Sequence, residues 1–196
     1  DCYNHEKLHI GYSEAKEETS RLMLSAFQYR MIADVPVGVF LSGGYDSTAV
    51  TALLQAHSTR KIKTFTIGFE DPKFNEAKHA KNVADHLGTE HYEYICPHKD
   101  VLDIVPQWAD IYDEPFGDIS GIPTTLVSRM ARKEVTVALS ADGGDEVFAG
   151  YPKYFKALLR IRQLDKTPFK GLLKNFIPAG MARDITVQNK WSKLKD

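Results

Sequence analysis

The residues best suited to chemistry form one short segment, Ser42-Gly-Gly-Tyr-Asp-Ser47, which directly follows the apolar residues 35–41. Its two glycines remove side chains where the backbone must approach a ligand closely. Its serines, together with Thr48, offer hydroxyls beside the backbone N–H groups of a predicted helix N-terminus, an arrangement that binds anions. Asp46 would repel a bare anion, so its presence indicates Mg2+ shared with bound phosphates. The segment therefore predicts a phosphate-binding turn.

A plainer interpretation of this segment is a tight turn between a strand and a helix, in which the glycines only permit the bend. The whole string after an apolar strand is more specific than a glycine pair, and it favours phosphate binding. Neither G-x-x-x-x-G-K-[ST] nor G-x-G-x-x-G occurs in the sequence. The motifs of Walker-type and Rossmann-type nucleotide sites are therefore absent.

A second carboxylate has similar surroundings further along the chain. Asp145 follows Gly143 and Gly144 beyond the end of a predicted strand, as Asp46 follows the first glycine pair. Two carboxylates at one edge of a parallel sheet would suit a hard Mg2+ ion. An alternative is that Asp145 caps a short helix over residues 146–150.

Hydrophobic patterning predicts the elements that must position these residues. Short apolar runs alternate with segments of helical periodicity, which is typical of a doubly wound α/β fold with a parallel sheet. In such a sheet the ligand lies at the carboxyl ends of the strands. Strands are expected at residues 35–41, 62–69, 91–96 and 135–140, and helices at residues 13–33, 46–56, 75–87, 99–112, 124–133 and 152–163.

Three local signals refine these helices. Ser13 is expected to cap the first helix, and Gly88 is expected to close the helix over residues 75–87. Leu22, Ala26, Tyr29 and Ala33 recur at helical spacing, so they are expected to form the buried face of the first helix.

Charge divides the chain of 196 residues unevenly, although its net charge is only -1. Residues 151–196 hold 11 Lys and Arg against 3 Asp and Glu, whereas residues 1–150 hold 14 against 23. We expect a catalytic domain over residues 1–150 and a truncated, helical, basic extension over residues 151–196. The basic side chains are interpreted as a solvated face rather than a nucleic-acid site. No apolar run reaches the length of about 18 residues that a membrane helix needs.

The motif Ser-Gly-Gly-x-Asp-Ser resembles the signature of the N-type ATP pyrophosphatases, which cleave ATP between the α- and β-phosphates. Three further blocks resemble the synthetase domain of asparagine synthetases within that superfamily. The resemblance covers about residues 13–160, and it implies an adenine nucleotide alpha hydrolase-like fold. The blocks are Phe65-Thr-Ile-Gly-Phe69, Asp113-Glu-Pro-Phe-Gly-Asp118 and Leu139-Ser-Ala-Asp-Gly-Gly-Asp-Glu-Val-Phe-Ala-Gly-Tyr151.

The resemblance implies roles for individual residues. Asp46 and Asp145 would hold Mg2+, and Asp142 would orient the substrate or assist proton transfer, with Asp145 as a second catalytic residue. Glu114, Asp118 and Ser120 would help to shape the acceptor pocket. The residues expected to bind ATP are Leu41, Ser42, Gly43, Gly44, Asp46, Ser47, Ile67, Gly68, Ser140 and Ala141.

The implied activity is an ATP-dependent, amide-forming ligase. Aspartate would be converted to asparagine through a β-aspartyl-AMP intermediate, with ammonia as the nitrogen source and with AMP and pyrophosphate released. A relative acting on a sugar acid or a β-amino acid, and a non-catalytic ATP- or AMP-binding module, are the alternatives. A lysine near the α-phosphate, which the family has, is not identified in the matching blocks.

The implied partners are a small carboxylic acid, ammonia and a glutaminase domain or subunit outside this chain. Cys2 is not expected to be the glutaminase nucleophile, because Asp1 precedes it and no glutaminase-sized segment separates it from Ser42. The two cysteines match neither a redox motif nor a zinc motif. We therefore expect a cytoplasmic enzyme that binds neither nucleic acid nor membranes, with a homodimer as the candidate assembly.

Overall fold

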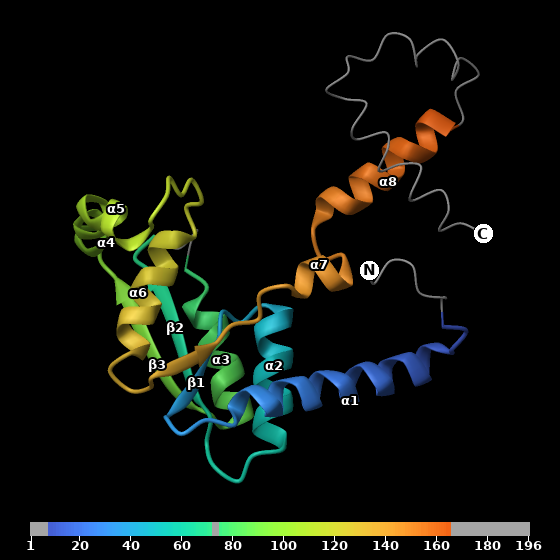
Figure 1. The fold of residues 1–196 in the computed structure, drawn as a ribbon, viewed down its shortest axis with the longest axis horizontal. Coiled ribbons are helices and arrows are strands. Elements are labelled where there is room, and N and C mark those ends of the chain that lie inside the picture. The colour runs from blue at the N-terminus through green and yellow to red at the C-terminus, as the bar shows by residue number, and fades with distance from the viewer. Residues whose placement is uncertain (1–7, 72–74, 166–196) are drawn as a thin grey trace. The chain divides into compact units, whose positions relative to one another are not determined.

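A parallel sheet of four strands, in the order β3-β2-β1-β4, organises the first part of the chain (Figure 1). The computed structural model describes residues 8–71 and 75–165. These residues belong to two compact units, Asp1–Gly143 and Gly144–Asp196. The strands, all in the first unit, are β1 (Val37–Phe40), β2 (Lys63–Phe69), β3 (Glu90–Cys96) and β4 (Val137–Leu139).

Helical crossovers make the strands parallel, as the alternating pattern predicts. Helix α2 (Tyr45–Ala56) joins β1 to β2, and α3 (Ala77–Leu87) joins β2 to β3. The chain then returns past β1, so that β4 pairs with β1 on the side opposite β2. The order of the strands thus reverses between β1 and β4, and this switch point is where open α/β sheets bind ligands.

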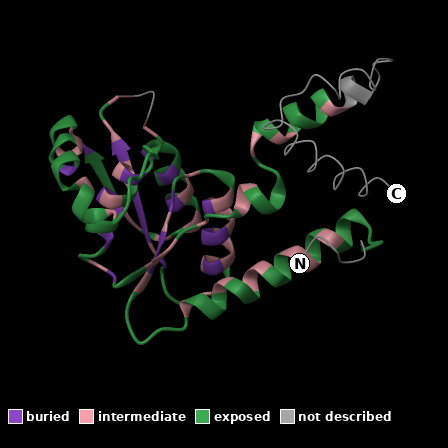
Figure 2. Ribbon diagram, turned by 45° about the horizontal axis from the view of Figure 1, so that its top comes forward, coloured by how far each residue is buried: buried purple, intermediate pink, exposed green. Residues whose placement is uncertain are grey.

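Helices cover both faces of the sheet, which confirms the predicted doubly wound α/β class. On one face, Val39 packs with Val50 and Leu54 of α2. On the other, Phe65 packs with Val127 and Ala131 of α6 (Gly121–Ala131). Figure 1 shows α6 on the side of the sheet away from α2 and α3, and Figure 2 shows buried residues on the strands and on the helix faces toward them.

Helix α1 (Tyr12–Met31) is present, but the prediction of its buried face is wrong. Leu22 is 53% exposed and Tyr29 is 78% exposed, whereas Phe27 and Met31 pack against the core of α2 and β1. Both sets recur at helical spacing, so periodicity alone could not decide which set faces the sheet. Ser13 does not cap the helix either: the N-cap residue is Gly11, and Ala33 lies beyond the C-terminal end.

The single helix expected over residues 99–112 is interrupted. The structure has α4 (His98–Ile104), a 3-10 turn η2 (Val105–Gln107) and α5 (Trp108–Ile111). Pro106 lies in the interruption, and a proline has no N–H group to donate along a continuing helix. By contrast, Gly88 closes α3 as predicted, with the left-handed φ of 70° that glycine tolerates.

The second unit contains two helices among its described residues, α7 (Gly144–Phe148) and α8 (Pro152–Asp165). The helix predicted over residues 152–163 is therefore confirmed, with a proline at its first position, where the missing N–H costs nothing. The predicted domain division at residue 150 stays a prediction. Residues 166–196, which complete the predicted extension, and Cys2 lie outside the described residues.

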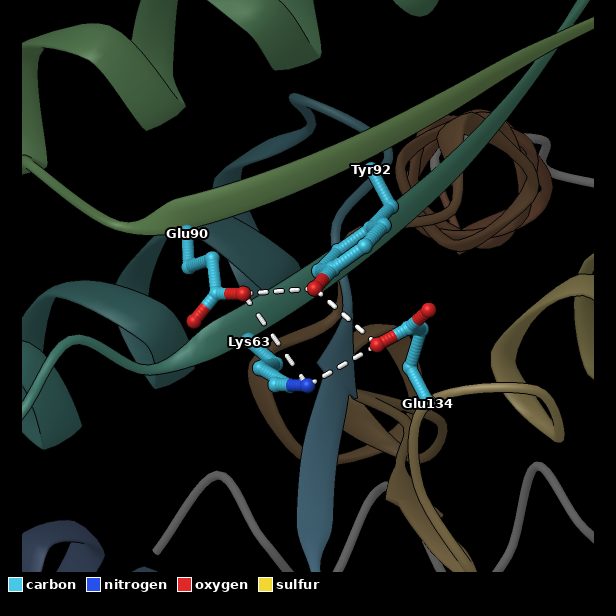
Figure 3. A network of polar contacts seen from close by, with 4 residues as sticks. All are labelled: Lys63, Glu90, Tyr92 and Glu134. Atoms are coloured by element: carbon cyan, nitrogen blue, oxygen red, sulfur yellow. Dashed lines mark hydrogen bonds and ion pairs between the residues drawn. The ribbon is translucent and has the colours of Figure 1, made fainter.

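A network of polar side chains closes the amino edge of the sheet (Figure 3). Lys63 Nζ lies 3.0 Å from Glu134 Oε2 and 3.9 Å from Glu90 Oε1. The Tyr92 hydroxyl lies 2.5 Å from Glu90 Oε1 and 3.1 Å from Glu134 Oε2, so it can donate to either carboxylate. Lys63 and Glu90 are register partners in β2 and β3, which explains why they meet. The network thus joins two strands to the segment after α6.

Candidate nucleotide-binding site

The predicted phosphate-binding turn lies between β1 and α2. Leu41 is buried at the end of the strand, and its N–H donates to the Phe65 carbonyl at 2.9 Å. Gly43 has a φ of +83°, and a Cβ atom there would lie 2.7 Å from the backbone nitrogen of Ala80. Glycine is therefore required twice, by backbone conformation and by the close approach of α3.

Serine hydroxyls hold this turn from inside. Ser42 Oγ and Ser47 Oγ lie 3.0 Å apart, and the Ser42 N–H donates to Ser47 Oγ at 3.2 Å. The Gly44 N–H donates to Ser42 Oγ at 3.3 Å. Gly44 is the N-cap residue of α2, and no side chain caps this helix start. The turn is thus preorganised, and the first amides of α2 have the orientation that binds anions.

Thr48 contributes a buried hydroxyl next to this turn. Among the described residues its Oγ1 atom has no hydrogen-bond partner. A buried hydroxyl without a partner is costly, so such a group indicates a missing partner. An oxygen-rich ligand such as a phosphate would fit it. Asp46, two residues earlier, is half-buried in the first turn of α2 and supplies a carboxylate of the kind that Mg2+ prefers.

A second turn follows β4. Ser140 Oγ donates to Asp142 Oδ2 at 2.7 Å, and both residues are exposed. Ala141 is half-buried and packs against the core of α2 and β1. Gly143 has a φ of +95°, and a Cβ atom there would meet nothing within 4 Å. Because β1 and β4 are paired parallel strands, this turn and the Ser42 turn are neighbours at the switch point.

Ile67 and Gly68 occupy β2, the other neighbour of β1. Ile67 is half-buried and packs into the cores on the α6 side of the sheet, whereas Leu41 packs on α3. A Cβ atom on Gly68 would lie 2.6 Å from Asn75 Oδ1 and 2.8 Å from Ala77 Cβ. Both residues therefore have packing roles, and their contribution to a nucleotide site stays a prediction.

Asp145 belongs to the second unit. It lies in the first turn of α7, which begins one residue earlier, so the alternative that Asp145 is the N-cap residue is wrong. The Gly150 N–H donates to the Asp145 carbonyl at 3.0 Å. Nearby, a hydrogen bond to Glu146 raises the pKa of Tyr151 to about 12. The Mg2+ pair of Asp46 and Asp145 stays a prediction, as does the catalytic role of Asp142.

No group of three or more His, Cys, Asp or Glu side chains within the described ranges could hold a metal ion by itself. This is compatible with Mg2+, which is commonly held by one or two carboxylates together with substrate phosphates. In the same ranges, no helix has both the length and the apolar composition that crossing a membrane requires.

The predicted acceptor loop joins α5 to α6. Glu114, Asp118 and Ser120 are all exposed there. Asp118 Oδ1 accepts the Ser120 N–H at 2.8 Å, and this hydrogen bond lowers the pKa of Asp118. The loop follows helices that start at the end of β3 and precedes α6, which runs back toward the start of β4. It therefore lies at the carboxyl edge of the sheet, like the Ser42 turn.

Sequence reasoning did not identify the support that α3 gives to the turn. Ala80 and Ala84 are buried and pack directly against Leu41. Their small side chains allow the backbone of α3 to approach Gly43. The recurrence of alanine at positions 77, 80 and 84 at helical spacing is the signal that could have revealed this contact.

A cavity of about 620 Å³ lies on another part of the first unit, between α6 and β4. None of the predicted site residues lines it. We place the candidate site at the two turns rather than in this cavity, because the cavity is an open groove on the α6 face of the edge strand. The residues that define its walls include Phe40, Tyr112, Ser128, Arg129, Arg132 and Val137.

Comparison with known proteins agrees with the motifs. The family model described as Asparagine synthase matches residues 18–196. The chain is 49% identical over 136 residues to a putative asparagine synthetase [glutamine-hydrolyzing] 2 of Methanocaldococcus jannaschii, covering 69% of this chain and 26% of that protein. It is 32% identical over 186 residues to asparagine synthetase [glutamine-hydrolyzing] 1 of Bacillus subtilis, covering 92% and 29%.

Among solved structures, an NH3-dependent NAD synthetase from Campylobacter jejuni is similar at 14% identity and a TM-score of 0.46, covering 90% of this chain and 93% of that one. The chain spans only between a quarter and a third of the length of the two curated relatives. Use of ATP is expected for members of the family whose model matches. The match over residues 18–196 shows that this chain belongs to the asparagine synthase family.

Proposed function

We propose that this chain is the synthetase part of an ATP-dependent, amide-forming ligase that converts aspartate to asparagine. In this proposal, a substrate carboxylate oxygen attacks the α-phosphorus of ATP, and the bond to the β-phosphate oxygen breaks. The products of this step are β-aspartyl-AMP and pyrophosphate. Ammonia then attacks the acyl carbon, AMP leaves, and a proton is lost from nitrogen to give the amide.

The preorganised turn between β1 and α2 is the observation that supports this proposal most. Its amides and hydroxyls gather at the switch point of a parallel sheet, and Thr48 Oγ1 is a buried donor without a partner among the described residues. In phosphoryl chemistry, fixed donors of this kind stabilise charge that develops on oxygen. The turn would hold the pyrophosphate portion of ATP.

Mg2+ would supply neutralisation of phosphate charge when it is bound, and Asp46 and Asp145 are the residues that we propose to hold it. The residues of the chain supply the other interactions with the nucleotide. Ser42 and Ser47 orient the phosphates, and Gly43 lets the backbone approach them. Ser140 and Ala141 lie in the turn after β4, where their backbone would border the nucleotide.

Asp142 is the carboxylate that we propose to orient the substrate or to assist proton transfer. It is exposed, and its Oδ2 atom accepts a hydrogen bond from Ser140. That contact leaves the second carboxylate oxygen available to a substrate ammonium group or to ammonia.

Names of the relatives motivate the proposed partners. Those proteins are called glutamine-hydrolyzing, so a glutaminase part would supply ammonia in the complete protein. A ligase for another acid, such as a sugar acid or a β-amino acid, would use the same phosphate turn. A non-catalytic nucleotide-binding module is the second alternative, and it would bind ATP without turnover.

The test is Mg2+-dependent exchange of labelled pyrophosphate into ATP, measured in the full-length protein with and without aspartate. Asp46→Ala is expected to reduce the exchange by about 100-fold or more, because charge at the reacting phosphates is no longer balanced. Glu14→Ala is the matched control: Glu14 is an exposed acid in the first turn of α1, outside the candidate site.

Exchange that needs aspartate and is lost only in Asp46→Ala would establish adenylation of aspartate. Exchange with a different acid would keep the reaction class and correct the substrate. Binding of ATP without exchange, across aspartate, sugar acids and β-amino acids, would contradict the ligase proposal and leave the binding module.

A further inference from the structure

Three aromatic rings hold the loop between α5 and α6. The rings of Tyr112 and Phe116 are stacked, with centroids 4.3 Å apart and planes 8° apart. The Trp108 ring lies 4.8 Å from Tyr112 and 6.2 Å from Phe116, centroid to centroid. Trp108 Nε1 also donates to the Phe116 carbonyl at 3.1 Å. These three residues, here called the aromatic clasp, tie the middle of the loop to the helix before it.

Gly121 is the point at which the clasp meets α6. It is buried, and a Cβ atom on it would lie 2.5 Å from Trp108 Cη2, 2.7 Å from the Tyr112 hydroxyl and 3.0 Å from Phe116 Cε1. Its φ is not in the left-handed region, so space rather than backbone conformation requires a glycine. The Gly121 carbonyl accepts from Thr125 Oγ1 at 2.8 Å. All three aromatic side chains therefore occupy the space that a side chain at position 121 would need.

The loop between these contacts is exposed, so burial of its own polar residues does not order it. Residues 113–120 are all exposed, and Phe116 contributes the ring that reaches the clasp. The clasp is anchored in the core at the end of β3, because Trp108 packs with Cys96, Ile104 and Leu126. Its position is thus fixed relative to the carboxyl edge, where the Ser42 turn also lies.

We propose that Gly121 and the aromatic clasp are positioning residues for the acid substrate. They fix residues 113–120, and with them Glu114 and Asp118, in the conformation that receives the acceptor. This inference rests on the proposed function and on the expectation, implied by the family resemblance, that this loop helps to shape the acceptor pocket. Placement errors of about 1 Å can cost about 100-fold in rate, so a modest shift of the loop has a measurable effect.

The test compares Gly121→Ala with Gly117→Ala in the full-length protein. Gly117 lies in the same loop, but a Cβ atom on it would meet nothing within 4 Å. We expect Gly121→Ala to raise the aspartate concentration for half-maximal pyrophosphate exchange about tenfold. The dissociation constant for ATP should stay within about twofold in both variants, because the clasp does not touch the Ser42 turn.

Trp108→Phe keeps a ring and removes the Nε1–H donor, so it tests the clasp if Gly121→Ala does not fold. We expect its aspartate requirement to rise about threefold, as for loss of one hydrogen bond. Hydrogen exchange of the Ser120 and Gly121 amides, which donate to Asp118, should be faster than wild type in both clasp variants and unchanged in Gly117→Ala.

A folded clasp variant with faster loop exchange and an unchanged aspartate requirement would overturn the positioning role. Equal losses of ATP affinity and aspartate affinity would overturn it too, because they would indicate general damage. Absence of acid-dependent exchange in the wild type is a different result: it would contradict the proposed function itself.

Discussion

At the amino edge of the sheet, charged side chains form ion pairs with one another. At the carboxyl edge, by contrast, polar groups are held in position and one of them has no internal hydrogen-bond partner among the described residues. Lys63 pairs with Glu134 and lies 5.4 Å from the centre of the Tyr92 ring. At the other edge, Ser42 and Ser47 hold a turn beside the Thr48 hydroxyl, which has no hydrogen-bond partner among the described residues. Groups that pair internally stabilise a fold, and groups held in position but unpaired can bind.

The largest expected difference is between alanine substitutions of two glycines with positive φ, Gly43 at the carboxyl edge and Gly88 at the amino edge. Gly43→Ala forces a side chain into a positive φ and against α3, so we expect a loss of about 2 to 3 kcal/mol in the free energy of unfolding, with ATP binding abolished. Gly88→Ala meets open space, so it should cost only about 1 kcal/mol and preserve ATP binding. Urea unfolding and calorimetric ATP titration would measure both.

Equal losses of stability in the two glycine variants would show that packing of α3 on the turn is unimportant. Retention of ATP affinity in a folded Gly43→Ala protein would contradict the assignment of the turn.

A smaller contrast removes one hydroxyl from each edge. Thr48→Val deletes the buried hydroxyl that has no partner within the described chain, so stability should rise by up to about 1 kcal/mol while ATP binds about fivefold more weakly. Tyr92→Phe deletes a hydroxyl that pairs with Glu90 or Glu134, so stability should fall by about 1 kcal/mol with ATP binding unchanged. The two substitutions should change the free energy of unfolding in opposite directions. A destabilised Thr48→Val protein would refute this prediction.

The smallest effect concerns pH at the amino edge. The hydrogen bond from Lys63 lowers the pKa of Glu134, so the folded state binds its proton less readily than the unfolded state. This stabilisation is present above the unfolded value near 4.5 and is lost as the pH falls through the lower folded value. Glu134→Gln should therefore flatten the fall in stability below pH 4.5 by a small amount, since the pair is solvent-accessible.

Unfolding midpoints between pH 3 and pH 6 would measure this effect, with 1 M salt as the control. At 1 M salt, interactions between exposed charges are screened beyond about 3 Å. Salt should therefore reduce the difference in unfolding midpoint between wild type and Glu134→Gln. A difference that is equal at pH 3 and pH 6 would refute the linkage.

Sequence patterns predicted most of the first unit because its elements are short and locally consistent. The apolar run before Ser42 is β1, and the glycine at position 88 ends α3 with a positive φ. The pattern failed for α1, where Leu22 and Phe27 lie on two apolar faces and only contact with α2 selects one. It also failed across Pro106, because helical periodicity continues through a residue that cannot donate the helix hydrogen bond.

The sequence by itself determined the turn between β1 and α2, because Ser42, Gly43 and Ser47 are neighbours in the chain and fold through local hydrogen bonds. It also determined the family through its motifs and their order. Only the tertiary structure decided that α3 presses on Gly43, that the β4 turn lies beside the β1 turn, and that three rings meet at Gly121. These contacts join residues far apart in the chain, and packing selects them among many patterns that the sequence alone allows.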